Sequence, residues 1–156
     1  MIEYKTCYQS PLGWLEISGT TEAVTAVRFV DQPGVKTESV PAVVQTCRQQ
    51  LDEYFQGQRT HFDLPLAQSG TPFQQAVWGA LTEIPFAQTA SYGQIAHRID
   101  NPKAVRAVGS ANGKNNIVII VPCHRVIGNN GKLTGYGGGL WRKEWLLNHE
   151  RQILES

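Results

Sequence analysis

The spacing of hydrophobic residues changes along the first third of the chain. β-Branched and aromatic residues gather in three short segments separated by turn-forming residues, which predicts strands at 2–8, 12–18 and 24–30. Over 41–56 the apolar residues recur at helical spacing instead, which predicts one amphipathic helix. We therefore expect this part of the chain to form a small sheet accompanied by a helix.

Helical patterns follow after residue 70. Thr71 stands before a proline, which is typical of a helix start, and the apolar positions beyond it predict a helix over 72–81. Ser91 is the expected cap of a second helix over 92–99, and an Asn-Pro pair begins a third over 101–112. Two short helices joined by a tight turn fit a helix-turn-helix, although an ordinary helical hairpin has the same pattern.

The last third combines one apolar run with a final helix. The run Ile-Val-Ile-Ile-Val at 117–121 is typical of a strand that is buried on both faces. After a turn at 129–131, the apolar spacing predicts an amphipathic helix over 140–153. The expected core contacts of this helix are Trp141, Trp145 and Leu146.

Charge is distributed unevenly between two parts of the chain. Turn-forming residues near Gln68 mark a boundary, so we expect an N-terminal domain at 1–68 and a C-terminal domain at 69–156. The first carries five basic and eight acidic side chains, and the second carries nine basic and five acidic ones. This asymmetry suggests that the second domain faces a polyanion, although chance in a short chain explains it equally well.

The three cysteines are Cys7, Cys47 and Cys123. An odd number without regular spacing does not indicate a disulfide framework, and no spacing typical of a zinc site occurs. Cys47 falls on the apolar face of the first helix, so we interpret it as a core thiol. No signal peptide or membrane-spanning run is visible. We expect a cytoplasmic protein with free thiols, no metal, no other cofactor and no membrane partner.

The segment from Pro122 to Val126 carries the most informative chemistry. Cys123 is followed by His124 and Arg125, and both an imidazole and a cation favour the reactive thiolate. Adjacent side chains of an extended chain point to opposite faces, so Cys123 and His124 can meet only at a sharp turn or through a water. Glu150 on the last helix is a candidate to orient the imidazole. Without further signals, a structural interpretation of one Cys-His pair would prevail.

A glycine-rich loop follows, with four glycines among the five residues of 135–139 and Tyr136 between them. Such a loop has little side-chain bulk, so a flat ligand could lie against its backbone. A flexible connector would have the same composition.

These residues together resemble the O6-alkylguanine-DNA alkyltransferases. The resemblance covers most of 72–150 with order and spacing retained, and it implies an α+β fold: a small ribonuclease H-like N-terminal sheet with a helix, then a mainly helical domain with a winged helix-turn-helix. The residues that carry it are Pro122-Cys123-His124-Arg125-Val126, Val77-Trp78, Ile84-Pro85, Ser91-Tyr92-Gly93-Gln94-Ile95-Ala96, Arg106-Ala107-Val108-Gly109, Gly135-Tyr136, Gly138-Gly139-Leu140, Lys143-Glu144-Trp145-Leu146-Leu147 and Glu150.

The resemblance implies catalytic roles for five residues. Cys123 would accept the alkyl group, His124 would act through a water, and Glu150 would orient the histidine. Asn115 would brace the segment between the recognition helix and the active site. Tyr92 would help to rotate the damaged nucleotide out of the duplex and would donate a proton to the leaving guanine.

The resemblance also implies a DNA-binding surface and a base pocket. Arg106 would enter the duplex where the base has left, and Ala107 and other small residues would suit the minor groove. From charge alone, Lys103, Lys114, Arg125 or Lys132 would contact phosphate. The pocket residues would be Tyr136, Gly137, Gly138 and Val126. Two positions depart from the commoner family pattern, Gly137 in the pocket and Asn116 after Asn115.

The expected function is repair of double-stranded DNA by one irreversible transfer per molecule, from O6-alkylguanine to Cys123, with O4-alkylthymine as a further candidate. A monomer is expected. Three rival functions are ranked lower. A non-catalytic binder of alkylated bases would lack Cys123, and a transcription factor would carry base-reading side chains on its second helix. A cysteine hydrolase would need an oxyanion hole.

Overall fold

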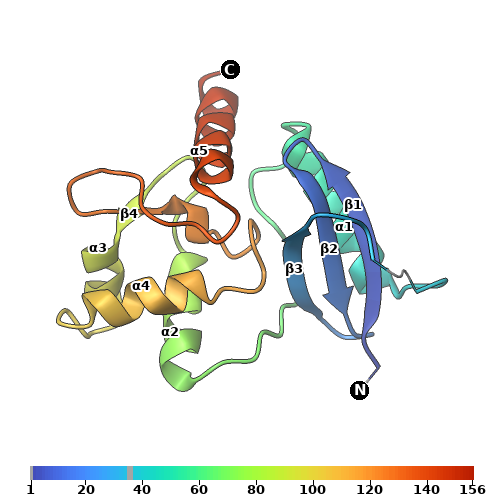
Figure 1. Cartoon of the computed structure of the whole chain (residues 1–156), viewed down its shortest axis with the longest axis horizontal. Helices are drawn as coiled ribbons and strands as arrows, with labels where there is room; N and C mark the ends of the chain where they lie inside the picture. Colours follow the sequence, from blue (N-terminus) through green and yellow to red (C-terminus); the bar gives the residue numbers. More distant parts are fainter. Residues whose placement is uncertain (1, 35–36) are drawn as a thin grey trace. The chain divides into compact units, whose positions relative to one another are not determined.

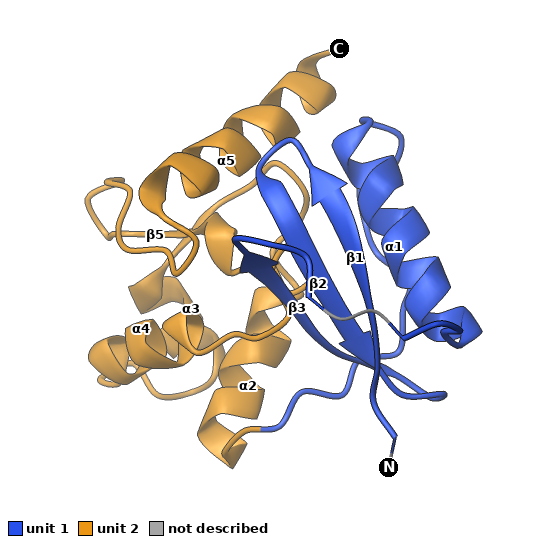
Figure 2. Ribbon diagram, turned by 45° about the vertical axis from the view of Figure 1, so that its right-hand side comes forward, with its two compact units in different colours: residues 1–69 blue, residues 70–156 orange. Residues whose placement is uncertain are grey.

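The computed structural model describes residues 2–34 and 37–156, and the chain divides into two compact units, 1–69 and 70–156 (Figure 2). Unit 1 contains the antiparallel strands β1 (Tyr4–Ser10), β2 (Gly13–Gly19) and β3 (Val24–Val30), in the spatial order β1-β2-β3. Helix α1 (Ala42–Phe55) lies along this sheet (Figure 1). The sheet and the helix expected for this part of the chain are thus confirmed.

Buried side chains that alternate along the strands form the core of unit 1. Leu15, Ile17 and Val27 are fully buried, as expected for the inward face of a half-covered sheet. Val44 and Cys47 are fully buried on α1, at the helical spacing that the sequence shows. The interpretation of Cys47 as a core thiol is therefore confirmed, and burial raises its pKa to about 12.

Unit 2 consists mainly of helices. They are α2 (Pro72–Leu81), α3 (Tyr92–Arg98), α4 (Val105–Gly113), the short 3-10 helix η1 (Cys123–Arg125) and α5 (Leu140–Glu155). The two-residue strands β4 (Ala90–Ser91) and β5 (Val126–Ile127) pair in parallel. Among the described residues, no helix is both long enough and apolar enough to cross a membrane.

The caps expected for two helices are present. The side chains of Thr71 and Ser91 each accept a hydrogen bond from the backbone N–H three residues later, and a glutamine returns a bond to the cap residue in both cases. These reciprocal bonds satisfy N–H groups that a helix leaves unpaired at its start. They fix where α2 and α3 begin, as the sequence indicated.

Three expectations for unit 2 are wrong. Helix α4 begins at Val105, because the residues after Asn101 form a turn first. Residues 117–121 form consecutive turns and not a strand: Ile119 has a φ of 72°, and the Val121 N–H bonds the Ile117 carbonyl at 3.0 Å. Trp141 is 58% exposed and is not a core residue, whereas Leu146 is fully buried.

The side chain of Gln50 on α1 binds the backbone of the segment that follows this helix. The Gln50 amide donates to the Asp63 carbonyl at 3.2 Å and accepts from the Asp63 N–H at 3.0 Å. Gln50 is buried, whereas its neighbour Gln49 is exposed. The pair of bonds therefore anchors the connection that leads toward unit 2.

We expect Gln50→Leu to lower the free energy of unfolding by about 1–3 kcal/mol, because both polar groups of the Asp63 backbone lose their partner. Gln49→Leu is the matched control on the same helix and should change stability by less than about 0.5 kcal/mol. Urea unfolding of the whole protein measures both. Equal effects of the two substitutions would contradict the anchoring role.

Candidate active site

The turns before η1 determine where Cys123 lies. The Cys123 N–H bonds the Val121 carbonyl at 2.8 Å, and the Arg125 N–H bonds the Pro122 carbonyl at 3.0 Å. The chain therefore turns sharply at Cys123, which is one of the two ways in which Cys123 and His124 could cooperate, and adjacent residues do not alternate as they would in a strand. Cys123 is 5% exposed.

Asn115 holds these turns with its side chain. Its amide donates to the Val121 carbonyl at 2.8 Å and to the Ile117 carbonyl at 3.3 Å, and its oxygen accepts from the Ile117 N–H at 3.0 Å. Asn115 also forms a hydrogen bond that lowers the pKa of the Cys123 thiol. One buried amide thus connects the end of α4 to the nucleophile, in the bracing position that the resemblance implied.

A buried carboxylate lies at the centre of the site. Glu150 is fully buried on α5, and its Oε2 lies 2.7 Å from Nε2 of His124. Arg125 donates to both carboxylate oxygens, at 2.9 and 3.0 Å, and the Ala87 N–H adds a fourth bond at 3.1 Å. Burial alone would raise the pKa of Glu150, but the hydrogen bonds from His124 and Arg125 and the positive charge of Arg125 outweigh it and hold the pKa well below its usual range.

The position of Arg125 corrects one expectation. Arg125 is 7% exposed, and besides Glu150 its guanidinium bonds the Ile84 carbonyl at 2.8 Å and lies over the Phe86 ring. These contacts point the side chain into the interior, so the phosphate contact inferred from charge alone is wrong. Its charge stabilises the ionised Glu150 instead.

The same arrangement determines the state of His124. Burial and the nearby cations Arg125 and Lys143 lower its pKa, against the pull of Glu150, so the imidazole is neutral. Because Glu150 is ionised and can only accept, the proton of the neutral ring lies on Nε2. Nδ1 is buried without a hydrogen-bond partner in the described part of the chain. A lone pair is therefore available there to receive a proton.

Burial also has the largest effect on the pKa of the Cys123 thiol. It raises the pKa of Cys123, and the Asn115 hydrogen bond and the charge of Lys143 lower it only in part. The cation that acts on the thiol is thus Lys143 and not Arg125. Lys143 is fully buried and donates to the carbonyls of Val126 and Thr134. Sequence reasoning missed this role, although Lys143 shares the buried face of α5 with Leu146 and Glu150, at helical spacing.

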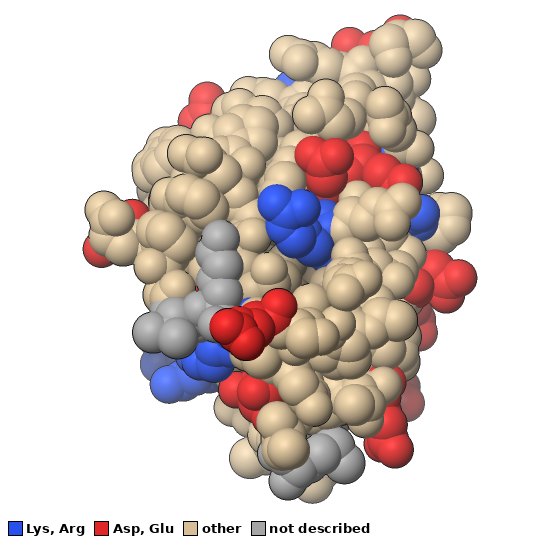
Figure 3. Space-filling view, turned by 90° about the vertical axis from the view of Figure 1, so that its right-hand side faces the viewer, with Lys and Arg blue, Asp and Glu red and all other residues tan. Residues whose placement is uncertain are grey.

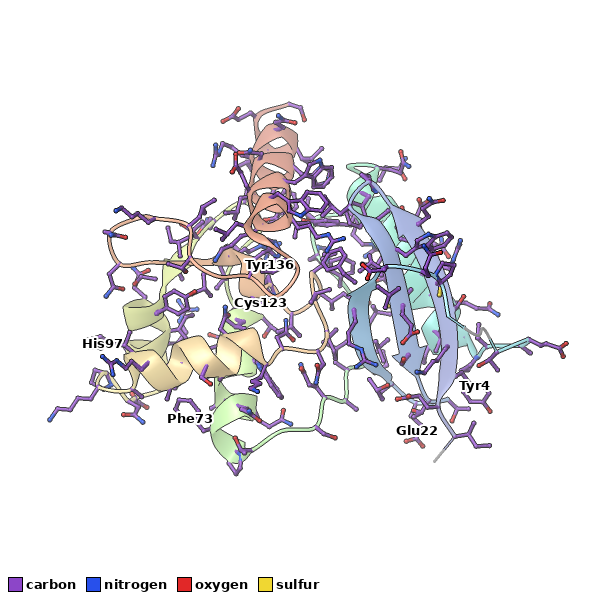
Figure 4. The ribbon with its side chains drawn as sticks, in the orientation of Figure 1. Tyr4, Glu22, Phe73, His97, Cys123 and Tyr136 are labelled. Atoms are coloured by element: carbon purple, nitrogen blue, oxygen red, sulfur yellow. The ribbon has the colours of Figure 1, made fainter. Side chains whose placement is uncertain are left out.

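Tyr136 and the glycine-rich loop lie next to the nucleophile. Figure 4 shows Tyr136 close to Cys123, and the charge of Cys123 contributes, after burial, to a pKa of Tyr136 raised well above its usual value. The Tyr136 hydroxyl is buried and has no partner among the described residues. A Cβ at Gly137 would meet nothing within 4 Å, and Val126 is fully buried. Gly137 is exposed, so the space beside it is open to solvent, and the Tyr136 hydroxyl can bond a ligand.

Apart from Arg125, the residues expected to touch DNA lie outside this buried cluster. Lys103, Arg106 and Ala107 are exposed, in the turn before α4 and on α4. Tyr92 begins α3, and its hydroxyl lies 2.6 Å from Oγ1 of Thr134. The side of the molecule seen in Figure 3 shows acidic groups at several places and, among the described residues, no continuous basic surface.

The described residues include no group of three His, Cys, Asp or Glu side chains that could hold a metal ion. The site combines a buried thiol, a neutral histidine with a free nitrogen, and an ion-paired carboxylate. Unit 2 also carries two short helices, α3 and α4, which pack against each other and are joined by a turn. These features define a class of proteins that combine such a helix pair with one supported cysteine thiol.

Comparison with known proteins identifies the family. Residues 3–68 match the ribonuclease-like domain of 6-O-methylguanine DNA methyltransferase, and residues 72–152 match its DNA binding domain. The chain belongs to the 6-O-methylguanine DNA methyltransferase family. It is 49% identical to the methylated-DNA–protein-cysteine methyltransferase of Mycolicibacterium paratuberculosis, with 97% of this chain and 94% of that protein covered.

Solved structures agree with this assignment. The chain matches the crystal structure of Mycobacterium tuberculosis O6-methylguanine methyltransferase with a TM-score of 0.88 and 46% identity, covering 97% of this chain and 94% of that one. It also matches the same organism's OGT in complex with DNA, with a TM-score of 0.86 and 48% identity over 94% of this chain and 92% of that one. The expected α+β fold with its two parts is thus confirmed.

We expect Arg125→Met to lower the free energy of unfolding by about 3–5 kcal/mol, because the buried Glu150 carboxylate loses the cation that donates to both of its oxygens. Arg98→Met is the control, since Arg98 pairs with Glu83 at 3.5 Å between exposed side chains and should lose less than about 1 kcal/mol. Urea unfolding at neutral pH compares the two. Similar losses would argue against a buried ion pair at Glu150.

Proposed function

We propose that this protein repairs DNA by moving the alkyl group from O6 of a modified guanine to Sγ of Cys123, once per molecule. The observation that carries the proposal is the single hydrogen-bonded unit of His124, Glu150 and Arg125 beside a buried Cys123, on the unit that matches the family's DNA binding domain. Relatives of the chain are named methylated-DNA–protein-cysteine methyltransferases.

The proposed reaction begins with the thiol proton. Nδ1 of His124 accepts it, directly or through one water, and the resulting imidazolium is stabilised by Glu150 at 2.7 Å. Sγ then forms a bond to the alkyl carbon while the bond from that carbon to O6 breaks, and the electron pair remains on the purine. A proton from the Tyr92 hydroxyl neutralises the leaving base. The product is a thioether, and since no second nucleophile lies in the described site, each molecule reacts once.

Access to the lesion requires the nucleotide to leave the base stack. We propose that Arg106 fills the space in the duplex, that Lys103 contacts phosphate, and that Ala107 with the other small residues of α4 enters the minor groove. The exposure of all three side chains supports this arrangement, as does the relative solved in complex with DNA. Small side chains read few base edges, so we expect little sequence preference.

The pocket beside Cys123 would receive the flipped base. Tyr136 offers an unpartnered hydroxyl, and Gly137, Gly138 and Val126 would line the remaining wall. Gly137 gives this loop little side-chain bulk and would influence which alkyl groups are accepted, and O4-alkylthymine is a second candidate substrate. All proposed site residues belong to unit 2 of one chain, which supports a monomer. Three free cysteines support a reducing, cytoplasmic location.

Intact mass after incubation with a duplex that contains O6-methylguanine is the direct test. We expect one added methyl group per chain, located on Cys123 by peptide mapping, with no further increase at excess substrate. Cys123→Ala should bind the duplex without being modified, whereas Cys47→Ala should be modified like the wild-type protein. A protein that binds the lesion and stays unmodified would support the recruiting, non-catalytic function instead.

Arg106→Ala tests the proposed entry into the duplex. We expect a loss of about tenfold or more in the rate of repair of duplex DNA, since the extruded nucleotide then leaves an unfilled space that costs a few kcal/mol. Transfer from a free O6-alkylated base should change by less than about twofold, because it requires no extrusion. Equal losses on the two substrates would refute the role of Arg106 in the duplex.

A further inference from the structure

The hydroxyl of Tyr92 is held by Thr134, whose side chain takes no part in the steps described above. The Tyr92 oxygen lies 2.6 Å from Oγ1 of Thr134, which is at the short end of the range for O–H···O bonds. We propose that Thr134 is a positioning residue for alkyl transfer, which acts by donating its hydroxyl hydrogen to Tyr92. This inference rests on the proposed function, because it concerns the proton that Tyr92 gives to the leaving base.

Thr134 is well fixed for such a role. Its carbonyl accepts a bond at 3.1 Å from Lys143, whose side chain is fully buried and also bonds the Val126 carbonyl. Its methyl group lies close to Gly128, where an added Cβ would come within 3.4 Å of it. The bond from Lys143 therefore holds the backbone of Thr134 in place, and its methyl group lies beside Gly128, while the hydroxyl hydrogen can still rotate.

The ring of Tyr92 is fixed from the other side. It packs near Gly109 on α4, where an added Cβ would lie 3.8 Å from two ring carbons. The phenol of Tyr92 thus lies between helix α4 and the loop that leads into α5. The direction of the hydrogen bond with Thr134 determines whether the Tyr92 hydroxyl can donate its own hydrogen elsewhere.

The direction of the bond determines the chemistry. A phenol oxygen carries one hydrogen and can also accept. When Thr134 donates, the Tyr92 hydrogen is free to point at the purine. As the bond from carbon to Sγ forms and the bond to O6 breaks, the electron pair stays on the purine and the Tyr92 proton moves to it. The resulting phenolate keeps the bond from Thr134 and regains a proton from water after the base has left.

This arrangement favours the transition state over the ground state. A hydrogen bond to an oxygen that gains negative charge is shorter and about twice as strong as one between neutral groups. The bond from Thr134 to Tyr92 therefore strengthens as the proton leaves, and only interactions that strengthen in the transition state accelerate the chemical step. A merely structural contact would lack this property.

Single-turnover methyl transfer from an O6-methylguanine duplex tests the inference. Thr134→Val keeps the shape and removes the hydroxyl, and we expect a rate about tenfold lower. Thr134→Ser restores the hydroxyl and should stay within about threefold of wild type. Thr82→Val is the matched control, because it removes a hydroxyl that bonds the Gly79 carbonyl at 2.6 Å at the end of α2, and its rate should be unchanged.

A double-mutant cycle with Tyr92→Phe separates positioning from structure. If Thr134 acts through Tyr92, Thr134→Val causes no further loss in a protein that already carries Tyr92→Phe. The loss should also shrink on a purine with an electron-withdrawing substituent, which needs less protonation to leave. A wild-type rate for Thr134→Val, or multiplying losses in the double variant, would overturn the inference. If Thr134→Val does not fold, Thr134→Ala takes its place in the same cycle.

The proposed function and the role of Thr134 can be refuted independently of each other. A wild-type protein that gains no methyl group on Cys123 would refute the function, whatever Thr134 does. A wild-type protein that is methylated, with Thr134→Val methylated at the same rate, would leave the function intact and refute only the role of Thr134.

Discussion

The site depends on one buried carboxylate. Glu150 has no exposed surface, and an isolated ion in such a place would be strongly unfavourable. Arg125, His124 and the Ala87 N–H together supply four hydrogen bonds to its two oxygens. These donors come from η1 and from the loop after α2, so satisfying the charge also brings those segments to α5. The packing of unit 2 and the tautomer of His124 thus depend on the same carboxylate.

The loop after α2 shows what this arrangement costs. Ala87 has a φ of 64°, in the left-handed region that alanine disfavours by about 1–2 kcal/mol. Its N–H points at Glu150, and a hydrogen bond to a charged acceptor contributes about 1.5–3 kcal/mol. The bond can therefore offset the strain. A strained backbone residue beside a charged group is a feature often found at functional sites.

Local signals predicted much of this fold, and tertiary partners decided the rest. The capping residues Thr71 and Ser91 and the alternation in unit 1 act over a few residues, so their elements were predicted well. The apolar run at 117–121 was misread because a buried turn and a buried strand have the same composition. Backbone carbonyls of this run accept hydrogen bonds from the side chain of Asn115, where a strand would bond a neighbouring strand. Arg125 was misjudged, and the role of Lys143 was missed, because charge usually indicates exposure.

The burial of Cys123 has a consequence for the lifetime of the protein in the cell. Oxidants attack the thiolate, and they do so most readily where it is accessible. Cys123 is 5% exposed and burial raises its pKa, so at rest it is neither accessible nor ionised. If the protein acts once through Cys123, as proposed, oxidation of this thiol before it meets a lesion would inactivate the molecule. Burial would then protect the unused protein from oxidation, while requiring that the thiol be deprotonated when the lesion is bound.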